Sequence, residues 1–417
     1  MTWWIRSPLV AVALVWLGFL AVFGEPLAAW RPAPLEARAG VVILVTSPSN
    51  AGPGSLREAI LTADRAGTRT RIEIRTPRIV LESPLPPLVN PKGVVIDASP
   101  SDTEIDARAV PGGPVLDVAA ARSFVRGLKI RGAAGQGILV RAAGARLVQV
   151  TLADCDVGVH LVEGAEDLLV ESSTFEDNGT GVRVAAGASG VSVSNNRFRK
   201  HERAAVWAVS PSPPQRTASP ALVVRQNRFD EDRISVVLIN VLGQVEDNQF
   251  ARAGEAAIYL TGPGVVRRNR LHGGGGVGLF ADAPSGALIE DNELDHNFAF
   301  GLLLRQASRT VVLRNRVYEN GYGIVVVFGE RGGSLVADNL ILSQGEDGLY
   351  VVGASPILRA NRAFGNRGVG LRVLDYVPLQ GAPHIADPRL EDNDFRDNAL
   401  DAVQGEYHEL RARPKAR

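Results

Sequence analysis

The stretch VEDNQFARAGEAAIYLTGPGVVRRNRLHGGGGVGLFADAPSGALIEDNELDHNFAFGLLLR, residues 245–305, contains the pattern that determines the fold. Within it, Asn248, Asn269 and Asn292 each follow a short apolar strand. Such an Asn recurs along the chain at spacings of 31, 21, 21, 23, 23, 24, 22 and 32 residues, at Asn196, Asn227, Asn248, Asn269, Asn292, Asn315, Asn339, Asn361 and Asn393. A second apolar strand that begins with a small residue follows most of these Asn, as in GLF, GLLL and GIVVV.

This unit of roughly 22 residues predicts one coil of a parallel β-helix, with two strands and sharp turns between them. Each strand would pair with the same strand of the next coil, about 4.8 Å along the axis. Leucine-rich repeats have a similar length, but the L-x-x-L-x-L frame is missing. Helical repeats are excluded because the apolar period within each unit is two rather than 3.6. The β-helix is predicted to cover residues 68–405.

The recurring Asn has a structural explanation. Asn tolerates left-handed backbone angles at turns, and its amide can bond to the Asn of the coils above and below. We therefore predict an internal Asn ladder, and a second one from Asn297, Asn320, Asn366 and Asn398. The residue before the first Asn alternates in charge, which predicts a ladder in which each charge pairs with both neighbours, along Asp247, Arg268, Asp291, Arg314 and Asp338.

Both ends of the solenoid need a cover, because an open end exposes unpaired strand edges. Residues 41–67 are predicted to be an N-terminal cap. Ser55 and Glu58 form a capping box, and the short helix that starts there has an apolar stripe of Leu56, Ala59, Ile60 and Ala63. Residues 406–417 form a charged C-terminal tail.

The N-terminal segment predicts export. Residues 1–30 contain Arg6 and then an apolar run from Pro8 to Phe23, which fits a signal peptide or a membrane anchor, and residues 31–40 read as a linker. We expect a periplasmic or extracellular protein, attached to the inner membrane by residues 8–23 if the segment is not cleaved. Any contact with a membrane would be through this segment alone.

Composition narrows the classes of partner and chemistry. Lys+Arg and Asp+Glu number 45 each, so no overall field attracts nucleic acid, and no nucleic-acid partner is expected. The single cysteine, Cys155, excludes an intramolecular disulfide framework and a thiolate metal site, and is interpreted as a small buried hydrophobe. We expect a monomer.

The repeat resembles that of the right-handed β-helix repeat proteins of the pectin-lyase-like superfamily. The stretch VTSPSNAGPGSLREAI, from Val45 to Ile60, is similar to the opening segment of many bacterial exported β-helices. The resemblance implies an all-β fold, a right-handed single-stranded parallel β-helix (solenoid) with a short N-terminal capping helix. The superfamily includes polysaccharide lyases, hydrolases, uronate epimerases and proteins without known catalysis, so function must be argued from a site.

The register predicts which side chains of the second strand point outward. In chain order they are Leu139, His160, Arg183, Trp207, Leu238, Tyr259, Phe280, Leu303, Val325, Tyr350, Arg372 and Gln404. Seven consecutive coils, from Trp207 to Tyr350, present an apolar residue there, a stripe of roughly 29 Å. Two longer loops, Ser210 to Pro220 and Leu374 to Asp387, follow this strand at the two ends of the stripe.

These features predict a substrate-binding groove. Its floor would be Trp207, Tyr259, Phe280 and Tyr350, and it would be flanked by Arg183, Arg372, His160 and His384. Aromatic faces suit sugar rings, and arginine suits uronate or sulfate groups. In the alternative interpretation, the loops or the C-terminal tail bury the stripe as a second core.

The residues favour binding over catalysis. The outward positions carry no carboxylate, and no catalytic residue can be assigned. We therefore expect a binder of polysaccharide or of a cell-envelope component, with no cofactor. One alternative is a polysaccharide lyase or uronate epimerase, which alone would bring in Ca²⁺; another is a structural spacer or adhesin. No metal site is predicted, since His272 and His296 follow their Asn by three and four positions and do not stack in register.

Overall fold

The structure is a computed structural model that describes residues 40–212, 220–329, 333–406 and 408–409. The predicted signal peptide or anchor, with nearly all of the linker, lies outside these residues. In the part that is described, no helix has the length and apolar character needed to cross a membrane.

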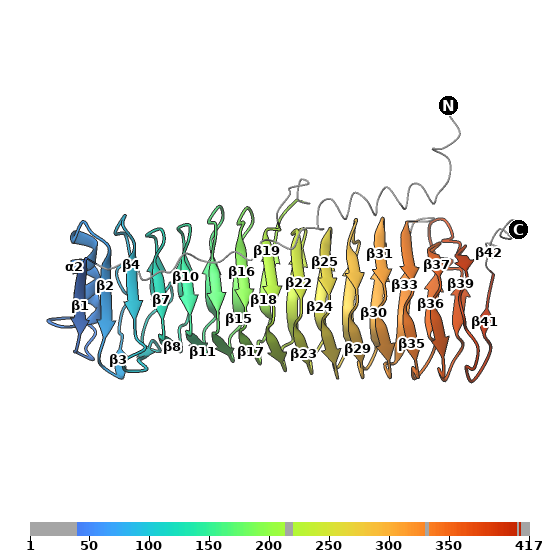
Figure 1. Ribbon diagram of the computed structural model, residues 1–417, viewed down its shortest axis with the longest axis horizontal. Helices are drawn as coiled ribbons and strands as arrows, with labels where there is room; N and C mark the ends of the chain where they lie inside the picture. Colours follow the sequence, from blue (N-terminus) through green and yellow to red (C-terminus); the bar gives the residue numbers. More distant parts are fainter. Residues whose placement is uncertain (1–39, 213–219, 330–332, 407, 410–417) are drawn as a thin grey trace, which may run out of the picture.

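The chain forms a right-handed parallel β-helix whose coils stack along one axis from β1 to β42 (Figure 1). Each full coil contributes three strands, where the repeat pattern predicted two. The Asn divides the first apolar run of the repeat, so that one strand lies before it and a short strand after it. The predicted all-β fold class is confirmed.

The strands form three sheets, named here A, B and C. Among the described residues, sheet A comprises β1 (Val41–Val45), β2 (Thr70–Ile74), β4 (Val94–Asp97), β7 (Phe124–Arg126), β10 (Arg146–Val148), β13 (Leu169–Glu171), β16 (Val191–Ser194), β19 (Leu222–Arg225), β22 (Gly243–Glu246), β25 (Gly264–Arg267), β28 (Leu288–Glu290), β31 (Thr310–Leu313), β34 (Ser334–Ala337), β37 (Ile357–Arg359), β40 (Arg389–Glu391) and β42 (His408–Glu409).

Sheet B contains the short strands that follow the Asn turn. They are β3 (Arg78–Val80), β5 (Glu104–Asp106), β8 (Lys129–Arg131), β11 (Thr151–Ala153), β14 (Thr174–Glu176), β17 (Arg197–Arg199), β20 (Arg228–Asp230), β23 (Gln249–Ala251), β26 (Arg270–His272), β29 (Glu293–Asp295), β32 (Arg316–Tyr318), β35 (Leu340–Leu342) and β38 (Arg362–Phe364).

Sheet C contains the strands that begin with a small residue in the sequence repeat. They are β6 (Leu116–Val118), β9 (Gln136–Val140), β12 (Val157–Leu161), β15 (Thr180–Val184), β18 (Ala204–Val209), β21 (Ile234–Ile239), β24 (Ala256–Thr261), β27 (Val277–Asp282), β30 (Phe300–Arg305), β33 (Tyr322–Val327), β36 (Leu349–Val352), β39 (Leu371–Leu374) and β41 (Val403–Gln404).

The core is a set of side-chain stacks, because equivalent residues of successive coils lie in register. In sheet B, Phe198 pairs with Phe229, and Phe229 with Phe250. Their rings, with that of Phe175, stack at centroid distances of 4.8, 4.8 and 4.7 Å. This spacing equals the separation of neighbouring strands, so each ring covers the next.

The Asn ladder is confirmed over its whole predicted length. From Asn196 to Asn361, each side-chain Nδ2 donates to the Oδ1 of the next Asn at 2.9–3.0 Å. The same Oδ1 also accepts the backbone N–H of the preceding Asn, as Asn292 does from Asn269 at 3.0 Å. The amide of Asn292 further donates to the carbonyl of Val266, in the preceding coil, at 2.9 Å. One side chain therefore bonds three successive coils together.

The second ladder is also confirmed where it was predicted, and Gln344 extends it between Asn320 and Asn366. Its N-terminal part contains other residues. Asn178 holds the backbone N–H of Cys155 at 2.9 Å, and burial raises the pKa of the Cys155 thiol to about 11, as expected for a small buried hydrophobe. His201 and Asp232 replace the amides in the next two coils, where their side chains are fully buried and 2.7 Å apart.

The predicted charge ladder is wrong in one respect. Arg268 bonds to Asp247 at 2.7 Å and Arg314 to Asp291 at 2.9 Å, each in the preceding coil. The second partner of each arginine among the described residues is the adjacent glutamate of that same preceding coil. The row therefore consists of separate clusters, because the long arginine side chains lean in one direction along the axis.

The predicted cap is confirmed as helix α2 (Leu56–Arg65), which lies at the β1 end of the solenoid (Figure 1). Ser55 accepts a hydrogen bond from the Glu58 N–H at 3.3 Å, and Glu58 accepts one from the Gly54 N–H at 2.7 Å. The predicted stripe is buried, and β1 before the helix already pairs with β2. At the other end, β42 pairs with β40, and the rest of the tail from residue 410 lies outside the described residues.

We predict that Asn292→Ala lowers the free energy of unfolding by about 3 kcal/mol, because it leaves buried polar groups of Asn269 and Val266 without partners. Chemical denaturation measures the effect. Asn393→Ala is the matched control: this ladder residue is half-buried at the C-terminal end, and its loss should cost clearly less. Equal costs at the two positions would contradict the cooperative ladder.

Candidate functional site

The outer surface of sheet C carries the predicted stripe, with one correction in register. Trp207 pairs with Val237, and Val237 with Tyr259, so Val237 holds the outward position. Leu238, predicted to point outward, faces the core and is fully buried. The error arose because β21 reads ISVVLI, where the alternation of apolar and polar residues gives no information on side-chain direction.

The stripe is the middle row of a wider apolar face. A second row lies on one side of it and contains Ala204, Ile234, Ala256, Val277, Phe300 and Tyr322. The row on the other side is apolar at its two ends, where Val209 pairs with Ile239 and Val327 pairs with Val352. Its middle is polar and contains Thr261, Asp282 and Arg305. We call these three rows together, on strands β18 to β36, the apolar face.

The second row was missed because two consecutive residues of each strand point inward. A Cβ on Gly301 would lie 2.5 Å from Val317 Cγ1 and 2.9 Å from Asn320 Nδ2, which are interior atoms. The next outward residue before Leu303 is therefore Phe300, three positions earlier rather than two. Glycine or another small residue at this position was the sequence signal that could have located the row.

The middle row is partly exposed rather than covered. Tyr259, Phe280 and Leu303, like Trp207 and Tyr350, are intermediate in accessibility, whereas the small Val237 and Val325 are 3% exposed. Large side chains stacked at strand spacing shield one another from solvent. An intermediate exposed fraction is therefore expected for each side chain in an aromatic row on a flat face. Tyr259 and Phe280 meet edge to face with centroids 5.3 Å apart.

A polar cluster lies at the edge of the apolar face. Asp282 accepts a hydrogen bond from the Tyr259 hydroxyl at 3.1 Å and is bonded by Arg305 at 2.5 Å. The Arg305 guanidinium also lies over the Phe280 ring, 5.5 Å from its centroid. Burial and the Asp282 carboxylate raise the pKa of Tyr259, which makes this phenol a poor base. The cluster therefore holds the aromatic residues in place.

The N-terminal end of the middle row is cationic. His160 pairs with Arg183, which pairs with Trp207. Arg183 is exposed and, in the part of the chain that the structure describes, forms no ion pair. Burial, together with the charge of Arg183, lowers the pKa of His160. A neutral imidazole and an uncompensated guanidinium lie side by side there.

The C-terminal end differs, because Arg372 is already engaged. Its guanidinium bonds to Asp347 at 2.5 and 3.0 Å and to the amide of Gln404, so it is neutralised within the protein. The same carboxylate raises the pKa of Arg372. Beside it, Tyr350 stacks on Tyr322 with centroids 5.7 Å apart. The two arginines predicted to flank the site are therefore not equivalent.

The loop from Leu374 to Asp387 folds back on itself beside the apolar face. Tyr376 and His384 exchange backbone hydrogen bonds of 2.9 and 2.8 Å, and both rings pack on Phe328. His384 therefore lies at the turn after β33 and β36, away from His160 at the other end of the row. Most of the other loop, residues 213–219, lies outside the described residues.

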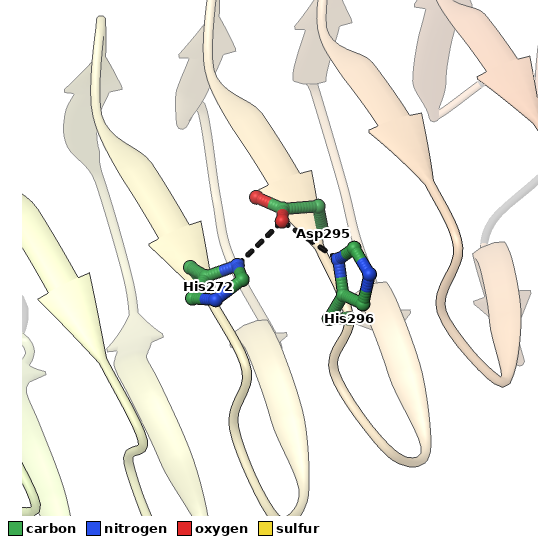
Figure 2. Close-up of side chains that lie close together, drawn as sticks. All are labelled: His272, Asp295 and His296. Carbon is green, nitrogen blue, oxygen red and sulfur yellow. Dashed lines mark hydrogen bonds and ion pairs between the residues drawn. The ribbon is translucent and has the colours of Figure 1, made fainter.

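Sequence reasoning also missed a cluster on sheet B. His272, Asp295 and His296 lie together, with ligand atoms all within 4.8 Å of one another (Figure 2). His272 pairs in register with Asp295, as its sequence position indicates. The two histidines do not stack in register, as expected, but Asp295 lies between the two imidazoles and bonds to both.

The comparisons identify the architecture. A family model described as "Right handed beta helix region" matches residues 116–265 and 243–362. Together these matches run from residue 116 to residue 362, which is more than half of the 417-residue chain. No curated protein matches the sequence.

Several solved structures are similar. Tailspike protein 3 of bacteriophage CBA120 has 10% identity and a TM-score of 0.58, covering 82% of this chain and 59% of its own. The A-module of a mannuronan C-5 epimerase from Azotobacter vinelandii has 14% identity and a TM-score of 0.45, covering 89% and 100%. The catalytic unit of an alpha-1,3-glucanase from Streptomyces thermodiastaticus has 14% identity and a TM-score of 0.48, covering 86% and 70%.

We predict that Arg183→Gln raises the pKa of His160, because the neighbouring positive charge that disfavours the imidazolium is removed. NMR titration of ¹³C-labelled histidine gives the value, and Arg372→Gln at the far end of the row serves as the control. An unchanged His160 titration would contradict the placement of these two side chains on neighbouring strands.

Proposed function

The chain belongs to the right-handed β-helix family, and from this premise we propose that it is an exported protein that binds polysaccharide along the apolar face. The polysaccharide is a component of the cell envelope or of its surroundings. The observation that carries the proposal is the row of outward aromatic and aliphatic side chains in seven consecutive coils from Trp207 to Tyr350.

The shape of this surface suits a polymer. The six intervals between rungs, at about 4.8 Å each, extend roughly 29 Å along the solenoid axis. A repeating chain lying along that axis would meet a similar contact at each rung. Tyr259, Phe280 and Tyr350 present partly exposed ring surface, and aromatic surfaces pack against the apolar C–H faces of sugars. Apolar surface of this extent marks an interaction site on a soluble protein.

The charged residues make the two ends of the apolar face chemically different. Arg183 at the N-terminal end supports binding of an anionic group, such as a uronate carboxylate or a sulfate, because it forms no ion pair within the described residues. Arg372 at the other end is neutralised by Asp347. An acidic sugar is therefore favoured beside Trp207, and neutral sugar surface is favoured from Tyr259 onward.

Binding without catalysis is favoured over the enzyme alternative. A lyase or epimerase needs a base beside the sugar, and the raised pKa of Tyr259 disfavours the phenolate. The nearby Asp282 carboxylate already bonds to Arg305 and to the Tyr259 hydroxyl. His160 and His384 lie at opposite ends of the surface. The role in export rests on the sequence of residues 1–30.

We predict that the double substitution Trp207→Ala and Tyr259→Ala weakens binding of the full-length chain to its polysaccharide by at least about tenfold, because stacking area is lost from the middle row. A glycan array of neutral and uronate polymers identifies the ligand, and calorimetry gives the affinity. Phe364→Ala is the matched control, since Phe364 is a partly exposed aromatic residue on sheet B.

Two outcomes would overturn the proposal. Binding that is unchanged in the double variant would remove the apolar face as the site. New reducing ends, or the ultraviolet absorbance of an unsaturated uronate, would show that the protein is a carbohydrate-active enzyme.

A further inference from the structure

A cluster of histidine and carboxylate side chains lies at the C-terminal ends of neighbouring strands of sheet B, on a surface separate from the apolar face. His272 ends β26, Asp295 ends β29, and His296 occupies the turn residue directly after Asp295. Glu319 occupies the equivalent turn of the next coil, and both His296 and Glu319 have left-handed backbone angles, with φ of 56° and 55°. Three successive coils thus contribute to one cluster.

The two imidazoles converge on one buried carboxylate (Figure 2). The Nδ1 of His272 lies 2.5 Å from Asp295 Oδ2, and the Nδ1 of His296 lies 2.9 Å from the same oxygen. The rings are 5.3 Å apart between centroids. Both histidine side chains are about half exposed, whereas that of Asp295 is only 2% exposed.

Asp295 is incompletely satisfied. Its Oδ1 is buried and has no hydrogen-bond partner among the described residues. The nearest cation, Arg270 Nε, is 3.8 Å from this oxygen, which is too long for a hydrogen bond. A buried carboxylate oxygen without a partner is costly. Asp230 in an earlier coil also has such an oxygen, but its other oxygen bonds to an arginine, whereas that of Asp295 bonds only to imidazoles in the described part of the chain.

The two hydrogen-bond partners of His296 also indicate an additional proton or cation at this site. Its Nδ1 faces Asp295, and its Nε2 lies 2.8 Å from Glu319 Oε2. A neutral imidazole carries one N–H and can donate to only one of these carboxylates. Either a second proton or a metal ion must therefore occupy the other nitrogen.

An earlier coil shows how the fold neutralises a carboxylate at the position of Asp295. Asp230, at the position of Asp295 three coils earlier, bonds at 2.6 Å to Arg252, the turn residue of the following coil. The residue that corresponds to Arg252 in the coil after Asp295 is Glu319. The chain places a second carboxylate where its other coil has an arginine, and two imidazoles beside it.

We propose that His272, Asp295 and His296 bind a divalent transition-metal ion of the zinc class. The ligands would be Nδ1 of each histidine and the Asp295 carboxylate, while Glu319 would accept a hydrogen bond from Nε2 of His296. Two histidines and one carboxylate form a common zinc ligand set, and a carboxylate behind a ligating histidine fixes its orientation. Because the imidazoles are half exposed, a fourth coordination position opens to solvent.

The geometry needs only small adjustments to hold the ion. Ligand atoms of a tetrahedral zinc site lie roughly 3.3 Å apart, and the three donor atoms here all lie within 4.8 Å of one another. The shorter contacts to Asp295 must open by less than about 1 Å, which rotation of the imidazoles allows. The bound ion would join the coils that contain β26 and β29.

Calorimetric titration of the full-length, tag-free, metal-stripped chain with Zn²⁺ tests this site. We expect one equivalent to bind, and we expect Co²⁺ to give the visible absorption of a histidine-ligated ion. His272→Ala and His296→Ala should each weaken binding at least about 100-fold, and Glu319→Gln about 10- to 100-fold. His384→Ala, which removes an imidazole outside the cluster, should leave the affinity unchanged.

Both histidine variants should fold, because each side chain is half exposed, and their unfolding curves in the absence of metal verify this. Absence of Zn²⁺ and Co²⁺ binding by the unmodified chain would overturn the proposal. So would binding that survives in folded His272→Ala and His296→Ala, or that is lost equally in His384→Ala. None of these outcomes depends on polysaccharide binding by sheet C.

Discussion

The hydrogen bond from one Asn side chain to the next is the interaction on which the rest of this structure depends. From Asn196 to Asn361 each amide joins its own coil to the following Asn and to a backbone carbonyl of the preceding coil, and Asn393 completes this series of nine. Because the amide must meet its neighbour at about 3 Å, no coil can slip by one residue without losing these bonds. The ladder therefore fixes the register of the three sheets from the coil of Asn196 onward.

Because the register is fixed, equivalent residues of successive coils form rows of side chains in the same environment. Apolar residues that face inward stack as the Phe175 to Phe250 column does, and residues that face outward stack equally well. The apolar face of sheet C and the cluster around Asp295 on sheet B both result from this. Each is a departure from the usual content of its row. The apolar face has aromatic side chains at outward positions where polar residues are expected, and the cluster has a glutamate, beside two histidines, where another coil has an arginine.

The sequence was sufficient for the fold because periodicity carries the information directly. The Asn spacing located both ladders, and the stripe of Leu56, Ala59, Ile60 and Ala63 located the cap helix. It was insufficient where side-chain direction depends on local backbone geometry. Leu238 was misplaced within an apolar run, and Phe300 and Tyr322 were missed because two consecutive residues point inward. His272 and His296 were discounted since register alone does not show that Asp295 lies between their rings.

The central claim is that a polysaccharide lies along the outer surface of sheet C, and hydroxyl-radical footprinting tests it most directly. The full-length chain is oxidised with and without an oligosaccharide that a glycan array identifies as a ligand. The account predicts that the ligand protects Trp207, Tyr259, Phe280 and Tyr350 on sheet C, and leaves the oxidation of Tyr318 and Phe364 on sheet B unchanged. Protection of the sheet B residues, with unchanged oxidation across sheet C, would contradict it.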